Sequence, residues 1–398
     1  MTSRRSTTTT TTTTVALGLA LALGLVASAC GSSAKTSTGS SSSGTAGASS
    51  ATVKVVLTSA GCAPTPATVP AGSIEFQVSN KDADAVTEAE LRTHDLSHIL
   101  GEQENLTPGL DGGFTVTIQP GTYEISCPGA KRSTADLKVT GAPTRASWQS
   151  DPQLSAAVSG YHAYVNQNVA DLITHTQAFC DAITAGDLTQ AQLRYAPARQ
   201  YYEHIEPVAE IWGDLDTQID GRWENPVTDP AQFVGFHRIE QLLFETETVA
   251  GAAPLCTDLV THERQLQSLV SSGEYSPVEM AAGATDLINE AADSKISGEE
   301  ERYSNVDLPT FRANVDGAQE IVTLLTPYLE AHSPATRASI SQRYQAVLGA
   351  LAPYQAAPGY LDTGYVDYST VTNPQRKVLS GAVNAYAEAL SKITAQVS

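Results

Sequence analysis

The sequence has no long hydrophobic run beyond its first residues, and it is poor in positive charge and in methionine. After residue 30 no segment approaches the roughly 20 consecutive apolar residues that a membrane-spanning helix needs. With 23 basic against 43 acidic residues the formal net charge is -20, and such a surface repels nucleic acid and attracts cations. No nucleic-acid partner is therefore expected. Only Met1 and Met280 are methionines, so the usual axial ligand of a blue-copper centre is scarce.

The first 30 residues have the layout of a secretory signal peptide. Arg4 and Arg5 supply a basic start, residues 15–29 form a short apolar segment, and small residues lead directly to Cys30. A cysteine at this cleavage point resembles a bacterial lipobox, which implies that Cys30 becomes the first mature residue and carries lipid. We therefore expect an exported protein that is lipid-anchored to the outer face of the cell membrane, in the periplasm or at the cell surface.

Two regions of different hydrophobic period follow a linker of Ser, Gly, Thr and Ala at residues 31–50. Between residues 51 and 140, short segments alternate apolar and polar positions and are separated by Pro-Gly turns, which is typical of a small β-sandwich or barrel. From residue 145 to 398 apolar residues recur at helical spacing, which predicts an all-α bundle. The expected fold class is α+β multidomain, with a β-sandwich followed by a helical bundle.

The most distinctive polar residues fall on a helix predicted over residues 230–245. Asp229 is suited to the N-cap and Pro230 to the first turn. His237 and Glu240 are three residues apart and share one face, which Phe233 and Phe244 continue on either side. Buried polar groups need partners, and a metal ion is one solution. A histidine hydrogen-bonded to a neighbouring glutamate is the alternative.

A second predicted helix, over residues 195–212, carries acidic residues along one face. These are Glu203, Glu206 and Glu210, and Pro207 should kink the helix beside Glu206. They either point toward the histidine or form an ordinary solvated acidic face.

Three segments resemble the imelysin-like family and, within it, the EfeO branch. They are residues 202–210 (YEHIEPVAE), residues 235–240 (GFHRIE, the family's G-x-H-x-x-E signature) and residues 294–304 (SKISGEEERYS). The resemblance runs from about Val53 to the C-terminus. It implies a cupredoxin-like domain at residues 51–140, followed by an imelysin-like bundle at residues 145–398.

The resemblance also implies a metal site, with Glu206, Asp220, His237 and Glu240 as ligands. Asp220 lies in the segment QIDGR at residues 218–222, which matches the family's Ile-Asp-x-Arg pattern. One imidazole and three carboxylates suit iron (Fe2+ or Fe3+) or zinc better than Cu(I), and three carboxylates balance a trivalent ion. We interpret the third matching segment as structural, with Ser297 and Glu300 forming a capping box at a helix start.

The cysteines leave alternatives open. Beyond Cys30 there are four, enough for two disulfides in an exported protein. Cys180 and Cys256 are the only cysteines of the predicted bundle and are expected to pair. In the first region no His or Met follows Cys127, so a blue-copper electron carrier is not expected. The resemblance suggests instead a modified cupredoxin site for iron or copper, built from Cys62, Glu88, Glu90, Glu124 and Cys127. An ordinary disulfide between Cys62 and Cys127 is an equally good alternative.

Three functions compete at this point. The resemblance implies an extracytoplasmic component of a bacterial iron-uptake system, which captures iron and delivers it to a membrane iron permease, alongside an exported haem peroxidase. Imelysins have also been grouped with peptidases, so a zinc-dependent peptidase is the alternative. The H-E-x-x-H pattern of zinc peptidases supplies two histidines and a free glutamate as base, whereas here only His237 is present. A lipoprotein scaffold without metal is the third. We expect a metal-binding transport component rather than an enzyme.

Lipid anchoring gives the first testable prediction. Because the lipid is attached through the thiol of Cys30, the Cys30→Ala protein should stay unprocessed or leave the membrane fraction. Incorporation of labelled fatty acid into both proteins measures this. Absence of label from the wild-type protein would rule out the anchor.

Overall fold

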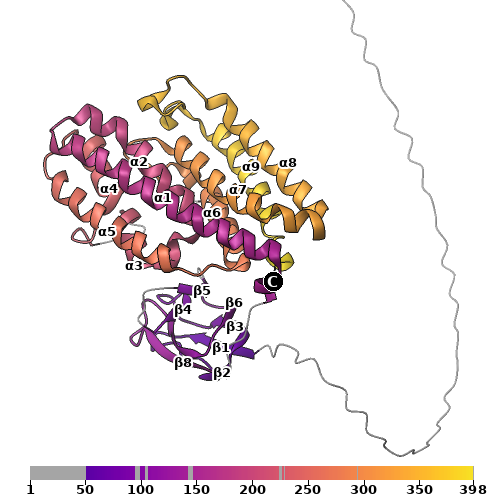
Figure 1. Cartoon of the computed structure of the whole chain (residues 1–398). Helices are drawn as coiled ribbons and strands as arrows, with labels where there is room; N and C mark the ends of the chain where they lie inside the picture. The colour runs from indigo at the N-terminus through magenta and orange to yellow at the C-terminus, as the bar shows by residue number, and fades with distance from the viewer. Residues whose placement is uncertain are drawn as a thin grey trace, which may run out of the picture. The chain divides into compact units, whose positions relative to one another are not determined.

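The two periodicities of the sequence correspond to two structural regions in the computed structural model (Figure 1). The structure describes residues 51–94, 99–103, 106–141, 147–223, 226–227, 229–293 and 295–397. The predicted signal segment with Cys30 and the linker of residues 31–50 lie outside these residues. Strands occupy the first region, and the second is helical apart from two short paired strands, β9 (Arg222–Trp223) and β10 (Pro226–Val227), so the predicted fold class is confirmed.

The first region contains two sheets that share one hydrophobic core. One sheet has the order β1-β3-β6, with bounds Ala51–Leu57, Gly72–Asn80 and Asp111–Ile118. The other has the order β2-β8-β7-β4-β5, with bounds Thr68–Pro70, Thr134–Thr140, Gly121–Ser126, Ala89–Thr93 and Ile99–Gln103. Val53, Val55 and Leu57 alternate inward along β1 and join Leu91 and Ile125 of the other sheet in this core. The region is therefore a β-sandwich.

Cys62 and Cys127 are joined in a disulfide inside this core. Both are buried, at 3% and 0% exposure. Sulfur atoms bonded to each other do not offer thiolate ligands. Of the two alternatives left by the sequence, the structure therefore has the disulfide and not a pair of cysteine ligands.

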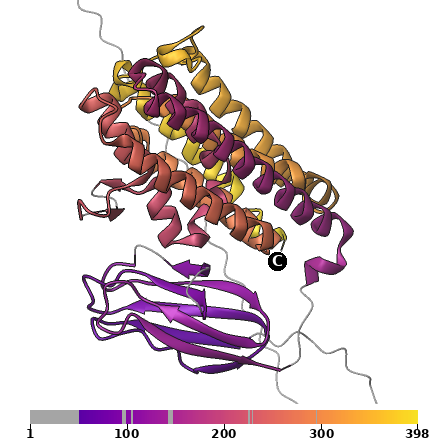
Figure 2. The ribbon, with the colours of Figure 1, turned by 60° about the vertical axis from the view of Figure 1, so that its left-hand side comes forward.

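The helical region runs from a short 3-10 turn, η1 (Ser147–Ser150), to η8 (Thr394–Gln396). Figures 1 and 2 show its long helices packed side by side. Its helices are α1 Pro152–Thr184, α2 Leu188–Ala209, α3 Asp214–Asp220, α4 Gly235–Glu240, α5 Ala252–Ser272, α6 Pro277–Asp293, α7 Asp307–His332, α8 Pro334–Leu351 and α9 Asn373–Leu390. Among the described residues no helix is long and apolar enough to cross a membrane.

Helix α2 is held closely by its neighbours α1, α6 and α7. At Gly283 of α6, an added Cβ would lie 1.8 Å from the carbonyl oxygen of Pro207 in the last turn of α2. Only glycine permits this approach. Glu203 and Glu206 on α2 are buried, at 0% and 9% exposure, so they do not form the solvated acidic face that was the alternative.

The helix that carries His237 starts later than the sequence predicts. Asp229 caps only a turn, in which its carboxylate accepts the N–H of Ala231, and α4 begins at Gly235. Gly235 has φ +72°, and a Cβ there would lie 2.2 Å from the carbonyl oxygen of Ile219 in α3. The predicted start at Pro230 is therefore wrong, because the chain must first turn at a glycine against α3. A five-residue π-helix, η3 (Gln241–Glu245), continues α4.

Helices α1 and α5 are connected by the second disulfide and by a buried hydrogen bond. Cys180 is bonded to Cys256, the pair expected from the sequence. On the same sides of the two helices, Thr176 Oγ1 donates to Glu263 Oε1 over 2.6 Å. Glu263 is fully buried and its second carboxylate oxygen has no hydrogen-bond partner in the described part of the chain. Burial raises the pKa of this carboxyl from 4.5 to about 8.

Glu263 should make the stability of the bundle depend on pH. Because the folded state binds this proton more tightly than the unfolded state, the contribution of Glu263 to the free energy of unfolding is fully present below pH 4.5 and is lost as the pH rises toward 8. Glu263→Gln should remove the fall and raise the free energy of unfolding at pH 8 by roughly 2–4 kcal/mol. Urea denaturation at pH 5 and pH 8 measures it, with the exposed Glu330→Gln as control. A fall in the free energy of unfolding from pH 5 to pH 8 that is as large in the Glu263→Gln protein as in the wild-type protein would contradict this assignment.

Candidate metal centre

His237 lies at the centre of the most polar part of the bundle interior. It is 2% exposed, and its Nδ1 lies 2.9 Å from Glu240 Oε2. The other oxygen of Glu240 accepts the backbone N–H groups of Tyr303 (3.0 Å) and Ser304 (2.7 Å). We assign the proton of this hydrogen bond to Nδ1 of His237, with Glu240 as the acceptor, although burial raises the pKa of Glu240 well above its usual range.

The opposite ring nitrogen, Nε2, is therefore left with a free lone pair. It is buried and has no hydrogen-bond partner within the described residues. Burial, with Arg199 adding to it, holds the pKa of His237 well below its usual range, so the ring is neutral. A neutral imidazole whose other nitrogen donates to a carboxylate is the usual form of a histidine ligand to a metal.

Two carboxylates face this nitrogen. Asp220 Oδ1, from the C-terminal end of α3, lies 3.6 Å from Nε2, and Glu300 Oε1 lies 3.8 Å from it. One ligand atom from each of the three residues lies within 4.8 Å of the others. Although burial raises it, Lys295, Arg222 and Arg199 together hold the pKa of Glu300 well below its usual range. Glu300 is thus a carboxylate, whose two oxygens bond Arg199 and Arg222.

The other side of the ring is less suited to a metal. There, one ligand atom each of Glu301, Glu240 and His237 lie within 4.8 Å of one another. Glu301 Oε1 already accepts Arg199 Nε at 2.8 Å and Thr310 Oγ1 at 2.7 Å, and Glu240 is occupied as described. The ring nitrogen without a hydrogen-bond partner among the described residues is Nε2, and the two acidic side chains that face it, Asp220 and Glu300, also bond Arg199.

Two buried cations, Arg199 and Lys295, and the half-buried Arg222 lie among the acidic residues. Arg199 is 1% exposed and pairs with Glu203 (2.7 Å), Glu301, Asp220 and Glu300. Arg222 bonds Glu300 and, at 2.8 Å, Glu290. Lys295, on the 3-10 turn η4 (Lys295–Ser297), bonds Glu206. Buried charges are tolerated only when paired in this way.

The structure brings together three of the four predicted ligands. Asp220, His237 and Glu240 meet at the imidazole, where Glu240 holds Nδ1 and Asp220 faces Nε2. Glu206 is not among the residues whose ligand atoms gather around His237 in the described part of the chain. Its two oxygens contact Lys295 and Asn314 instead.

Glu300 is the residue that the sequence analysis missed. Residues 298–304 form turns and no helix begins at Ser297, since α7 starts at Asp307. The predicted capping box is therefore wrong, because Glu300 is 2% exposed and turned inward to Arg199 and Arg222. The sequence did contain one signal of a charged network. Arg199 lies four residues before Glu203 and seven before Glu206, so a cation shares the acidic face of α2.

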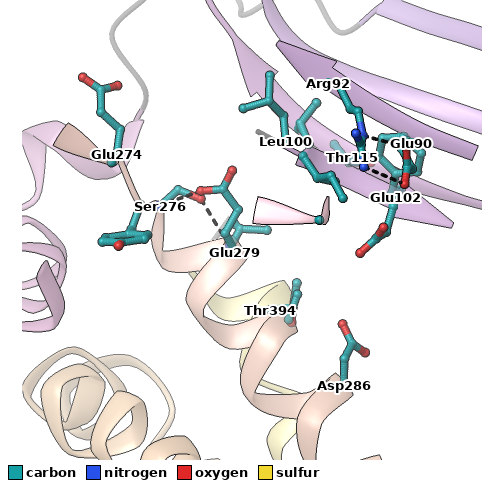
Figure 3. A pocket seen from close by; sticks show the side chains of 18 of the residues that line it. Glu90, Arg92, Leu100, Glu102, Thr115, Glu274, Ser276, Glu279, Asp286 and Thr394 are labelled. Carbon is teal, nitrogen blue, oxygen red and sulfur yellow. Dashed lines mark hydrogen bonds and ion pairs between the residues drawn. The ribbon is translucent and has the colours of Figure 1, made fainter. Parts of the chain in front are cut away.

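The β-sandwich contains two smaller acidic groups, and neither is the predicted one. Glu88 and Glu90 lie within reach of Glu102, which is opposite Glu90 in the pairing of β4 with β5. Figure 3 shows Glu90 and Glu102 near Arg92, which bonds Glu90 at 2.7 Å. Glu124 pairs in register with Arg92 and Asp136 and lies 3.3 Å from His94. The predicted set of Cys62, Cys127, Glu88, Glu90 and Glu124 is thus not assembled, since the strand register separates Glu124 and the cysteines form the disulfide.

Both regions of the chain resemble known protein families. The Imelysin family model, which carries the label peptidase M75, matches residues 157–393, and a cupredoxin-like domain model matches residues 20–136. The protein named iron uptake system component EfeO of Escherichia coli strain K12 is 39% identical over 346 residues, covering 86% of this chain and 90% of the relative. Proteins of the same name from Shigella flexneri and Shigella sonnei match with the same identity and coverage.

Removal of the charge of Glu300 should destabilise the bundle. Glu300→Gln leaves the buried Arg222 and Arg199 short of a partner, which should cost roughly 3–5 kcal/mol of unfolding free energy. The neighbouring Glu299 has a side chain that is 57% exposed, so Glu299→Gln should change it by less than about 0.5 kcal/mol. Chemical denaturation of the two proteins without metal compares them directly. Equal stability of the two variants would show that Glu300 does not hold the network together.

Proposed function

Because the chain belongs to the imelysin family, in its EfeO-type branch with a cupredoxin-like domain before the helices, we propose that it is an iron-binding component of a bacterial iron-uptake system. The relatives named above are iron uptake system components. The single observation that supports iron binding by this chain is the buried, unpartnered Nε2 of His237 facing the carboxylates of Asp220 and Glu300.

In this proposal His237, Asp220 and Glu300 hold the iron as cargo. Nitrogen and carboxylate donors suit iron or zinc better than Cu(I). Glu240 is a positioning residue, because its bond to Nδ1 orients the ring and fixes the tautomer that leaves Nε2 free. This set differs from the ligands implied by family resemblance in two ways. Glu300 replaces Glu206, and Glu240 supports His237 instead of binding the metal itself.

The place of capture and the partners are part of the same proposal. The layout of residues 1–30 supports export and lipid attachment at Cys30. A body attached through the Ser- and Gly-rich residues 31–50 to the outer face of the membrane is well placed to hand iron to a membrane permease. The family resemblance adds an exported haem peroxidase as a second partner.

The peptidase label of the family motivates a competing test. A zinc peptidase needs a free carboxylate as base beside the metal-bound water. Near His237, Glu240 and Glu301 are occupied by backbone amides, Arg199 and Thr310, which supports a transport role. Hydrolysis of an unfolded protein substrate by the zinc-loaded chain, lost in the His237→Ala protein, would favour the peptidase instead.

Loss of His237 or of Asp220, two of the three proposed ligands, should abolish tight iron binding. His237→Ala and Asp220→Asn should each weaken Fe(II) binding by more than about 100-fold, and Glu240→Gln by about 10–100-fold, as for an outer-shell partner. Anaerobic titration calorimetry measures the affinity, and circular dichroism checks that helical content survives. His332→Ala, on the exposed end of α7, is the matched control. Unchanged iron affinity in the His237→Ala protein would move the metal site to another part of the chain.

A further inference from the structure

Lys295 is the least expected side chain of the metal centre. It is 1% exposed, and four carboxylates surround its ammonium: Glu206 in direct contact, Glu203 at 3.6 Å, Glu300 at 3.7 Å and Glu290 at 3.9 Å. A positive charge inside a site for cations opposes the binding of its cargo, because like charges repel. A lysine that only neutralised the buried acidic residues could lie far from the proposed ligands. The ammonium of Lys295 instead lies beside Glu300, one of the carboxylates that face His237.

Glu206 is committed to this ammonium. One of its oxygens bonds Lys295, and the other accepts Asn314 Nδ2 at 2.6 Å. The same Asn314 amide donates to Glu203 at 2.7 Å, so α7 fixes both glutamates in place. Lys295 therefore takes the position that a metal ion bound to Glu206 would occupy.

The geometry points to Lys295 as a specificity-determining residue, a permanent internal cation that makes the centre favour divalent over trivalent metal ions. This inference rests on the proposed function and concerns the same site. The repulsion between Lys295 and a bound ion scales with the charge of the ion, so a trivalent ion is penalised half as much again as a divalent one. Arg199 and Arg222 act in the same direction on Asp220 and Glu300. The carboxylates of Glu206, Asp220 and Glu300 are thus compensated before any metal arrives.

The test compares Mn2+ and Ga3+, redox-inert probes for divalent and trivalent iron, with Ga3+ supplied as its nitrilotriacetate complex. Competition titrations on the full chain give the ratio of the two affinities. In the Lys295→Met protein, Ga3+ affinity should rise at least about 10-fold relative to Mn2+ affinity. Lys295→Arg, which keeps the charge, should leave the ratio within about 3-fold of the wild-type value.

The double variant Lys295→Met, Glu206→Gln tests separately whether Glu206 is a ligand. It removes both members of the ion pair, so the local charge is unchanged and no buried charge loses its partner. Both metal affinities and their ratio should stay within about 3-fold of wild type. Loss of both affinities in this variant would make Glu206 a ligand and overturn the inference.

The outcomes also separate this inference from the proposed function. An unchanged ratio in a folded, metal-binding Lys295→Met protein would overturn the inference alone. Failure of the wild-type protein to bind either ion would overturn the proposed function, and the inference with it.

Discussion

The candidate metal centre depends on the complete burial of one guanidinium group, that of Arg199. Its partners come from three separate parts of the helical region: Glu203 from α2 itself, Asp220 from α3, and Glu300 with Glu301 from the turn after η4. A buried charge is stable only while its partners stay in place. The requirement to satisfy Arg199 therefore holds α3 and the turn of residues 298–304 against α2, and this brings Asp220 and Glu300 to the imidazole.

The histidine is oriented by a second, local set of constraints. Gly235 lets α4 start directly against α3, and the amides of Tyr303 and Ser304 hold Glu240, which in turn holds Nδ1 of the ring. Orientation and charge are thus supplied by different residues. The ring presents a neutral donor, while Arg199, Arg222 and Lys295 decide how much negative charge is left for the cargo. In this account the centre selects its ion by charge balance as well as by ligand type.

The features that the sequence could predict are those set by local periodicity. Alternation at Val53, Val55 and Leu57 was enough for a strand, and the three-residue spacing of His237 and Glu240 was enough to place them on one face. Glu300 could not be found this way, because its role depends on a turn that returns to α2 from about 100 residues away. The start of α4 at Gly235 could not be predicted either. It depends on the close approach of Gly235 to the carbonyl group of Ile219, which stops the helix from starting at Pro230.

The central claim is that iron binds on the Nε2 side of His237, between Asp220 and Glu300. An anomalous difference map at the iron edge, from crystals of the wild-type protein soaked with Fe(II) without oxygen, tests it most directly. The account predicts one dominant peak within about 2.5 Å of His237 Nε2, with carboxylate oxygens of Asp220 and Glu300 in contact and Glu206 still bonded to Lys295. A dominant peak beside Nδ1, on Glu206, or at the Glu88, Glu90 and Glu102 group of the β-sandwich would contradict it.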